Sequence, residues 1–117
     1  MKDDAKLKQV MCYASRGLKL IPLWGIKLKK CECPQGAACS SPGKHPRIAD
    51  WQKEASNDTV KISRWLQRWP GMNIGVVTGA ESGVIVVDVD GDAGSAYIAE
   101  KGRGSPPIKT WVAKTGR

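Results

Sequence analysis

The sequence predicts an α+β domain, with a mixed or antiparallel sheet, flanking helices and one irregular cysteine-rich loop. Helical spacing of apolar residues marks the segments 3–16 and 57–69, whereas β-branched residues dominate 73–79 and 83–90. Between these groups, residues 28–50 hold three Cys, three Pro and two Gly without any periodicity. At 117 residues the chain is long enough for one domain at most.

The first predicted helix covers residues 3–16 and ends at Gly17. Its apolar residues recur at positions i, i+3, i+4 and i+7, namely Leu7, Val10, Met11 and Ala14. Cys12 lies next to this face, and we expect it to be a core thiol. The segment 18–24 then predicts a short strand, and Pro22 indicates an edge position or a strand end.

The second half of the chain predicts a helix, a hairpin, a further helix and a last strand. Asn57 or Asp58 can cap a helix that runs to about Trp69 and stops at Pro70-Gly71. The runs 73–79 and 83–90 are strand-like, and the turn around Glu81, Ser82 and Gly83 makes them an antiparallel hairpin. A short helix over 93–101 and a strand over 108–114 complete the prediction.

Charge is large and unevenly distributed. The net charge is +8, with eight bases against two acids in residues 1–30, five acids and no base in 71–100, and five bases in 101–117. An acidic pocket on a basic body suits an enzyme that holds divalent cations beside a polyanion, although a lysine-rich solvated surface has the same composition. No apolar run reaches the roughly 20 residues of a membrane span and no secretory segment begins the chain, so we expect a cytoplasmic protein without a membrane partner.

The loop contains a possible structural zinc site. Cys31, Cys33, Cys39 and His45 form the pattern C-x-C-x5-C-x5-H, and three thiolates with one imidazole suit tetrahedral Zn²⁺. Disulfides are the competing interpretation, but they need an oxidising compartment, and C-x-C is a cramped pair to bridge. Unliganded structural cysteines normally lie in apolar elements rather than among Pro, Gly, Ser and Lys. The sequence therefore predicts a zinc-binding loop over residues 28–47.

The segment GVIVVDVDGD carries a candidate site for a second kind of metal. On a strand, Asp88 and Asp90 project from the same face with Cα atoms about 7 Å apart. Two carboxylates so placed can hold Mg²⁺ or Mn²⁺ beside a triphosphate, as two-metal nucleotidyl transfer requires. A calcium loop starting at Asp88 fits poorly, because Ala93 replaces the expected Gly and Ala99 the expected acid. A pair of solvated carboxylates at a strand end is the other alternative.

The five tryptophans divide into two groups. Trp65 and Trp69 share a helical face with Ile62 and Leu66, which indicates core packing. Trp51 follows the basic segment KHPRIAD, so it is a candidate contact for nucleic acid or nucleotide.

The ordered series of these motifs resembles the bifunctional primase-polymerase (Prim-Pol) domain of the archaeo-eukaryotic primase superfamily, found in phages, plasmids and integrated elements. The resemblance runs through YASRGLKLIPL, the Cys-rich loop ending in GKHPR, Trp51, ISRWLQRWPGMNIGVVTG and SGVIVVDVDG. It implies that Asp88 and Asp90 are catalytic ligands for Mg²⁺ or Mn²⁺. It also implies that Lys44 and Arg47 contact nucleotide phosphates or template, and that the Cys/His loop is the zinc knuckle of some members.

The implied substrates are a single-stranded DNA template and nucleoside triphosphates. Whether the parent protein also contains a helicase domain stays an open question. The resemblance also implies a catalytic His and a third Asp that residues 1–117 do not supply. We therefore expect the chain to be the N-terminal portion of a primase-polymerase domain, truncated before the site is complete and inactive alone. Two other functions compete, namely a non-catalytic zinc-knuckle nucleic-acid-binding module and a Mg²⁺-dependent phosphohydrolase that uses Asp88.

Overall fold

The structure is a computed structural model that describes residues 2–106 and 109–113. It divides into two compact units, Met1–Ile85 and Val86–Arg117, which are described separately. Helices and small antiparallel sheets together make the chain an α+β protein, as the sequence predicts.

The first unit contains nearly all of the regular structure. In chain order its elements are α1 (Lys2–Ser15), β1 (Leu20–Leu23), β2 (Ile26–Lys27), β3 (Lys30–Cys31), the 3₁₀-helix η1 (Gly36–Ala38), α2 (Trp51–Glu54), α3 (Thr59–Arg68) and β4 (Asn73–Val76). The predictions for α1, β1, α3 and β4 are confirmed to within a few residues. No periodic pattern in the sequence predicts β2, β3, η1 or α2, because each of them has only two to four residues.

The main sheet pairs β1 with β4 in antiparallel register, from Leu20 opposite Val76 to Leu23 opposite Asn73. Ser56 adds a bridge to Leu20, and the N–H of Arg47 donates to the carbonyl of Pro22 over 2.9 Å. Since Pro22 has no N–H of its own, its carbonyl is the only backbone group that it needs to pair. The chain after the cysteine loop thus returns to β1.

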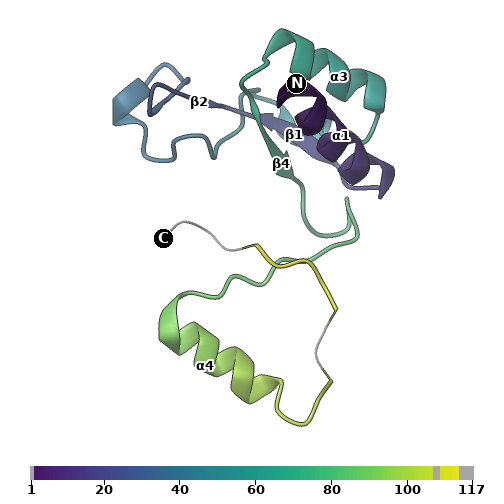
Figure 1. The fold of residues 1–117 in the computed structure, drawn as a ribbon, viewed down its shortest axis with the longest axis vertical. Helices are drawn as coiled ribbons and strands as arrows, with labels where there is room; N and C mark the ends of the chain where they lie inside the picture. The colour runs from purple at the N-terminus through teal and green to yellow at the C-terminus, as the bar shows by residue number, and fades with distance from the viewer. Residues whose placement is uncertain (1, 107–108, 114–117) are drawn as a thin grey trace. The chain divides into compact units, whose positions relative to one another are not determined.

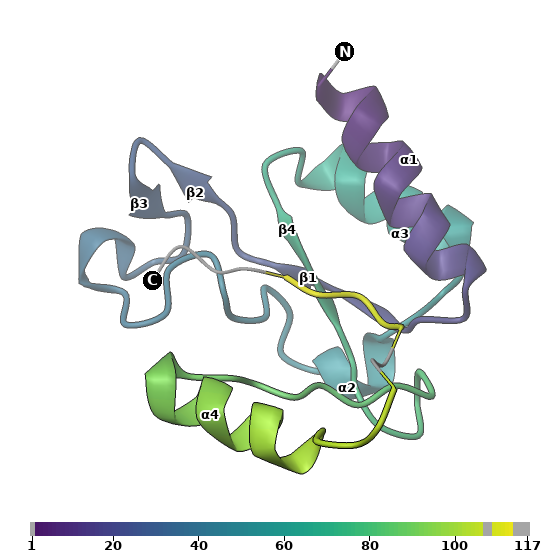
Figure 2. The same ribbon diagram turned by 60° about the horizontal axis from the view of Figure 1, so that its bottom comes forward.

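Helices α1 and α3 lie side by side against the β1–β4 sheet (Figures 1 and 2). The buried core between them consists of Val10, Ala14, Leu18, Leu20, Ile62, Trp65 and Met72. Leu20, Ile62 and Met72 are fully buried, and burial of such a side chain contributes about 1.5–3 kcal/mol. Trp65 and Trp69 pack in or against this core, which confirms their predicted structural role.

The N-cap of α3 agrees with the sequence prediction, whereas the position of Cys12 on α1 does not. Asp58 caps α3, because its Oδ1 accepts the N–H of Val60 over 2.9 Å. Cys12 is exposed, so its prediction as a core thiol is wrong. Val10 and Ala14 are the buried positions of α1, and a residue two places from each of them points to the opposite side of a helix.

The predicted strand over 83–90 is not formed. Only an isolated bridge joins Gly79 to Val84, and the following residues are irregular with exposed side chains, Ile85 by 85%. A strand needs a hydrogen-bonding neighbour, and among the described residues none pairs with residues 85–90. The predicted strand 108–114 is also absent over residues 109–113, and its ends lie outside the described residues. The second unit does contain the predicted helix, as α4 (Gly91–Lys101).

Candidate metal centre

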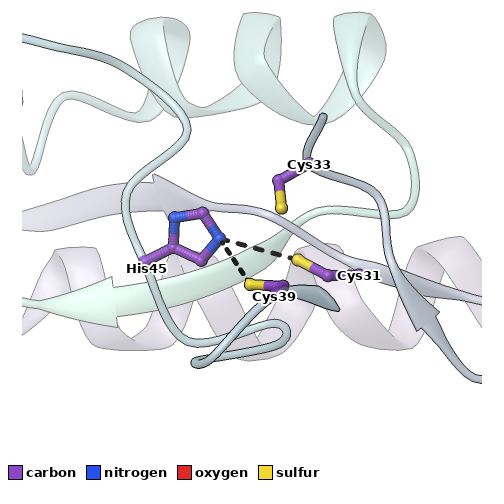
Figure 3. Close-up of side chains that lie close together, drawn as sticks. All are labelled: Cys31, Cys33, Cys39 and His45. Carbon is purple, nitrogen blue, oxygen red and sulfur yellow. Dashed lines mark hydrogen bonds between the residues drawn. The ribbon is translucent and has the colours of Figure 1, made fainter. Parts of the chain in front are cut away.

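The four predicted zinc ligands lie together at one end of the first unit. Cys31 closes β3, Cys33 follows in the next turn, Cys39 follows η1, and His45 precedes the return of the chain to β1. Their ligand atoms all lie within 4.8 Å of one another (Figure 3). The short elements β3 and η1 therefore fold a segment without apolar periodicity around a common point.

The spacing of these atoms matches a tetrahedral zinc site. The Nε2 atom of His45 lies 3.6 Å from the sulfur of Cys31 and 3.4 Å from that of Cys39. With Zn–S near 2.3 Å and Zn–N near 2.0–2.1 Å, tetrahedral angles place a sulfur and a nitrogen about 3.5 Å apart. The donor set and the geometry thus fit a metal such as zinc, with Nε2 as the ligand atom of His45.

The pKa values of Cys31 and Cys39 are shifted in opposite directions. Burial raises the pKa of the Cys31 thiol, but hydrogen bonds from the backbone N–H groups of Gly43 and Cys33 and contacts with His45 outweigh it, so the pKa falls from 9.0 to about 6. Burial is also the main reason that the pKa of Cys39 is raised, and its neighbouring sulfurs add to this. Cys31 is therefore the thiol best prepared to bind a cation at neutral pH.

Gly43 has a backbone conformation that few other residues adopt, with φ at +69°. A Cβ atom there would lie 2.9 Å from both Cγ1 of Ile26 and Nδ2 of Asn73. The amide of Asn73 also donates to the carbonyl of Gly43 over 3.0 Å. The loop thereby packs between the start of β2 and the start of β4.

Arg47 joins the cysteine loop to the rest of the unit. Its guanidinium carbon lies 4.3 Å from the ring centre of Trp24 and 4.8 Å from that of Trp69, and Nη1 lies 3.6 Å from a carboxylate oxygen of Glu32. Sequence reasoning had assigned Arg47 to nucleotide or template contact and had given Trp24 and Glu32 no role. The PGKHPR segment marks this region, but only the fold brings the two indoles to the guanidinium.

The other residues predicted to contact nucleic acid lie near this loop in the chain. Lys44 is exposed and follows Gly43 directly. Trp51 is half-buried as the first residue of α2. Both side chains therefore present at least part of their surface to solvent.

Asp88 and Asp90 lie in the second unit, and both side chains are exposed. Asp90 is the N-cap residue of α4, but its side chain forms no capping hydrogen bond. Within residues 86–106 and 109–113, no third thiolate, imidazole or carboxylate joins the pair in a metal-binding cluster. The pairing of these two carboxylates thus stays a prediction from the sequence.

Comparison with known proteins gives one match. Residues 11–117 match the Prim-Pol family, described as the N-terminal domain of bifunctional DNA primase/polymerase. The chain belongs to the Prim-Pol family. No curated protein and no solved structure matches it.

The Prim-Pol match covers every element from the end of α1 onward, including the Cys/His cluster and the Asp88–Asp90 segment. The chain is thus a DNA primase/polymerase-related domain, for which DNA and nucleotides are the corresponding substrates. Among the described residues, no helix combines the length and the apolar character that a membrane span requires.

Proposed function

We propose that the protein synthesises nucleic-acid chains from nucleoside triphosphates as a DNA primase/polymerase, in the replication of a phage, plasmid or integrated element. The observation that carries this proposal is the Prim-Pol match over residues 11–117, which includes both candidate metal sites. The reduced cysteines of a zinc knuckle suit the cytoplasm. A helicase domain in the same protein would be consistent with such a role.

The zinc knuckle has a structural role in this proposal. Cys31, Cys33, Cys39 and His45 hold Zn²⁺, whose binding stabilises a loop that buries little apolar surface. The guanidinium of Arg47 contacts the rings of Trp24, which follows β1, and Trp69, which follows α3. These contacts link the zinc loop to the rest of the unit. Lys44 and Trp51 are then left to contact the DNA template or the nucleotide.

Asp88 and Asp90 have the catalytic role. Both carboxylates are exposed and have no ion-pair partner among residues 2–106 and 109–113, so they are free to bind Mg²⁺ or Mn²⁺, which would polarise the triphosphate and activate the attacking hydroxyl. The backbone at Asp90 itself is extended, with φ at −106° and ψ at 119°, although the segment around it forms no strand. The resemblance implies that a His and a third Asp complete the site.

Template-dependent nucleotide incorporation tests the proposal, measured in the longer protein that the resemblance implies. Asp88→Asn and Asp90→Asn should each abolish primer extension, whereas Glu100→Gln, which removes an exposed acid at the other end of α4, should leave it intact. Primer extension that survives both aspartate substitutions would remove the catalytic assignment. Absence of any nucleotide incorporation by the wild type would instead favour a non-catalytic zinc-knuckle module, since the Cys/His cluster does not include those residues.

A further inference from the structure

The β2–β3 hairpin precedes the metal cluster and carries an unusual tip. Ile26 pairs with Cys31 and Lys27 with Lys30, so Leu28 and Lys29 form a two-residue turn. In both ribbon views the hairpin extends away from α1 and α3 (Figures 1 and 2). Because Cys31 belongs to the metal cluster, a bound ion would fix the base of this hairpin.

The turn has the wrong residues for its conformation. Leu28 and Lys29 have φ values of +51° and +62°, and they are the two non-glycine residues with positive φ in the described chain. Two-residue turns of this type normally contain Asn-Gly or Asp-Gly, because other side chains are strained there. Leu28 is also 86% exposed, so no packing within the unit offsets the strain. Strain without an internal contact to maintain it points to a contact outside the chain.

The tip is also strongly basic. Lys27, Lys29 and Lys30 are exposed, and Lys44 adjoins them because Gly43 packs against Ile26. None of the four side-chain ammonium groups forms an ion pair or hydrogen bond with residues 2–106 and 109–113. The nearby acid, Glu32, is paired with Arg47. Three exposed lysines of the hairpin thus flank one exposed aliphatic side chain, and a fourth, Lys44, follows the glycine that packs against the hairpin.

This combination suits a single-stranded nucleic acid. Phosphates complement the ammonium groups, and an unpaired base offers an apolar face on which an aliphatic side chain can pack. A duplex hides those faces inside its stack. A lipid surface fits less well, because membrane attachment needs a broad apolar face and the tip offers Leu28 with only a partly exposed Ile26 behind it.

We propose that the tip of the β2–β3 hairpin binds single-stranded DNA, with Leu28 against a base and Lys27, Lys29, Lys30 and Lys44 on the phosphates. The choice of DNA rests on the proposed function. The hairpin site itself rests on its turn conformation, its exposure and its charge.

Leu28→Gly gives the sharpest test, since stability and binding should change in opposite directions. Glycine adopts positive φ freely, so the variant should unfold at a higher temperature than the wild type. Its affinity for labelled oligo-dT should fall roughly fivefold, as for loss of one base contact. The salt dependence of binding should not change, because Leu28 carries no charge.

The lysines are tested by a pair of neutral substitutions. Lys27→Gln with Lys30→Gln should reduce the slope of log affinity against log salt by about 1.4, since each lost phosphate contact on a single strand contributes about 0.7. The control pair is Lys8→Gln with Lys53→Gln, exposed lysines of α1 and α2 that should leave the slope nearly unchanged.

The outcomes separate this inference from the proposed function. If the wild type binds oligo-dT and the hairpin variants behave like the control pair, the hairpin site is wrong and DNA remains the partner. If the zinc-loaded wild type binds no oligo-dT, the hairpin proposal and the proposed DNA partner are both wrong. If anionic phosphatidylserine vesicles bind through Leu28 while oligo-dT affinity is unaffected, the tip is a membrane contact and the proposal is overturned.

Discussion

The backbone N–H of Gly43 donates a hydrogen bond to the sulfur of Cys31 over 3.4 Å. This contact joins the second half of the cysteine loop to the ligand that closes β3. It depends on a backbone conformation at Gly43, with φ at +69°, that places the N–H toward the cluster. The geometry of the metal centre therefore depends on Gly43, although Gly43 is not a ligand.

Gly43→Ala should weaken metal binding although every ligand is kept. The new Cβ would meet Ile26 and Asn73 at 2.9 Å and displace the N–H that Cys31 accepts. Gly36→Ala is the matched control, because Gly36 also has positive φ, at +52°, but no atom lies within 4 Å of the added carbon. Both variants incur a strain of about 1 kcal/mol. Competition with a zinc-binding dye should show a larger loss of affinity for Gly43→Ala, and equal losses would contradict the role of this contact.

Zinc should be present at about one ion per chain by elemental analysis, because four ligands form a single cluster. Cys33→Ser should lose the zinc and melt residues 28–47 locally, which hydrogen exchange would report. Cys12→Ser should keep both the zinc and the protection, since Cys12 is exposed on α1 outside the cluster. A protected loop in zinc-free protein would argue against a folding role for the metal.

Arg47→Met should destabilise the first unit by about 1–2 kcal/mol, because it removes stacking on Trp24 and Trp69 and the ion pair with Glu32. Arg47→Lys should not restore the loss, since an ammonium group cannot stack as the planar guanidinium does. Lys44→Met is the control and should leave stability unchanged, because Lys44 is exposed. Chemical denaturation measures all three. Equal stability of the Arg47 and Lys44 variants would show that Arg47 is free for another role.

Removing the capping carboxylate of Asp58 should lower the stability of the protein, whereas removing that of Asp88 or Asp90 should not. Asp58→Ala should lower the free energy of unfolding by about 0.5–2 kcal/mol, because it removes the cap that accepts the N–H of Val60. Asp88→Asn and Asp90→Asn should leave stability unchanged or slightly raised, since both are exposed and two like charges close together repel. Thermal unfolding checks the comparison. Loss of stability on Asp90→Asn would make that residue a structural cap of α4.

The parts of the fold that the sequence predicted correctly are those in which local signals agree with packing. The apolar spacing around Val10 and the cap at Asp58 place α1 and α3, and the C-x-C-x5-C-x5-H pattern identifies all four members of the cluster. The prediction failed where the outcome depends on a distant partner. The β-branched run 83–90 has strand composition, but among the described residues it pairs only through the isolated bridge of Val84 to Gly79.

Arg47 has contacts within the site that the sequence does not predict, and its predicted contact with nucleotide or template stays a prediction. Its basic neighbourhood predicts a contact with phosphate, and its guanidinium carbon also lies 4.3 Å and 4.8 Å from the ring centres of Trp24 and Trp69, which are 45 residues apart in sequence. No local pattern encodes such a contact. The exposed lysines near Arg47 are the residues that we propose to contact phosphate.

Paramagnetic broadening by Mn²⁺ would show whether Asp88 and Asp90 bind the catalytic divalent ion. Substoichiometric Mn²⁺ added to the zinc-loaded, ¹⁵N-labelled chain should broaden the amide signals of residues 87–92 before any others. Asp88→Asn or Asp90→Asn should each reduce this broadening strongly, whereas Glu100→Gln should not. Broadening that is centred elsewhere, or that is the same in the two aspartate variants as in the wild type, would contradict the account.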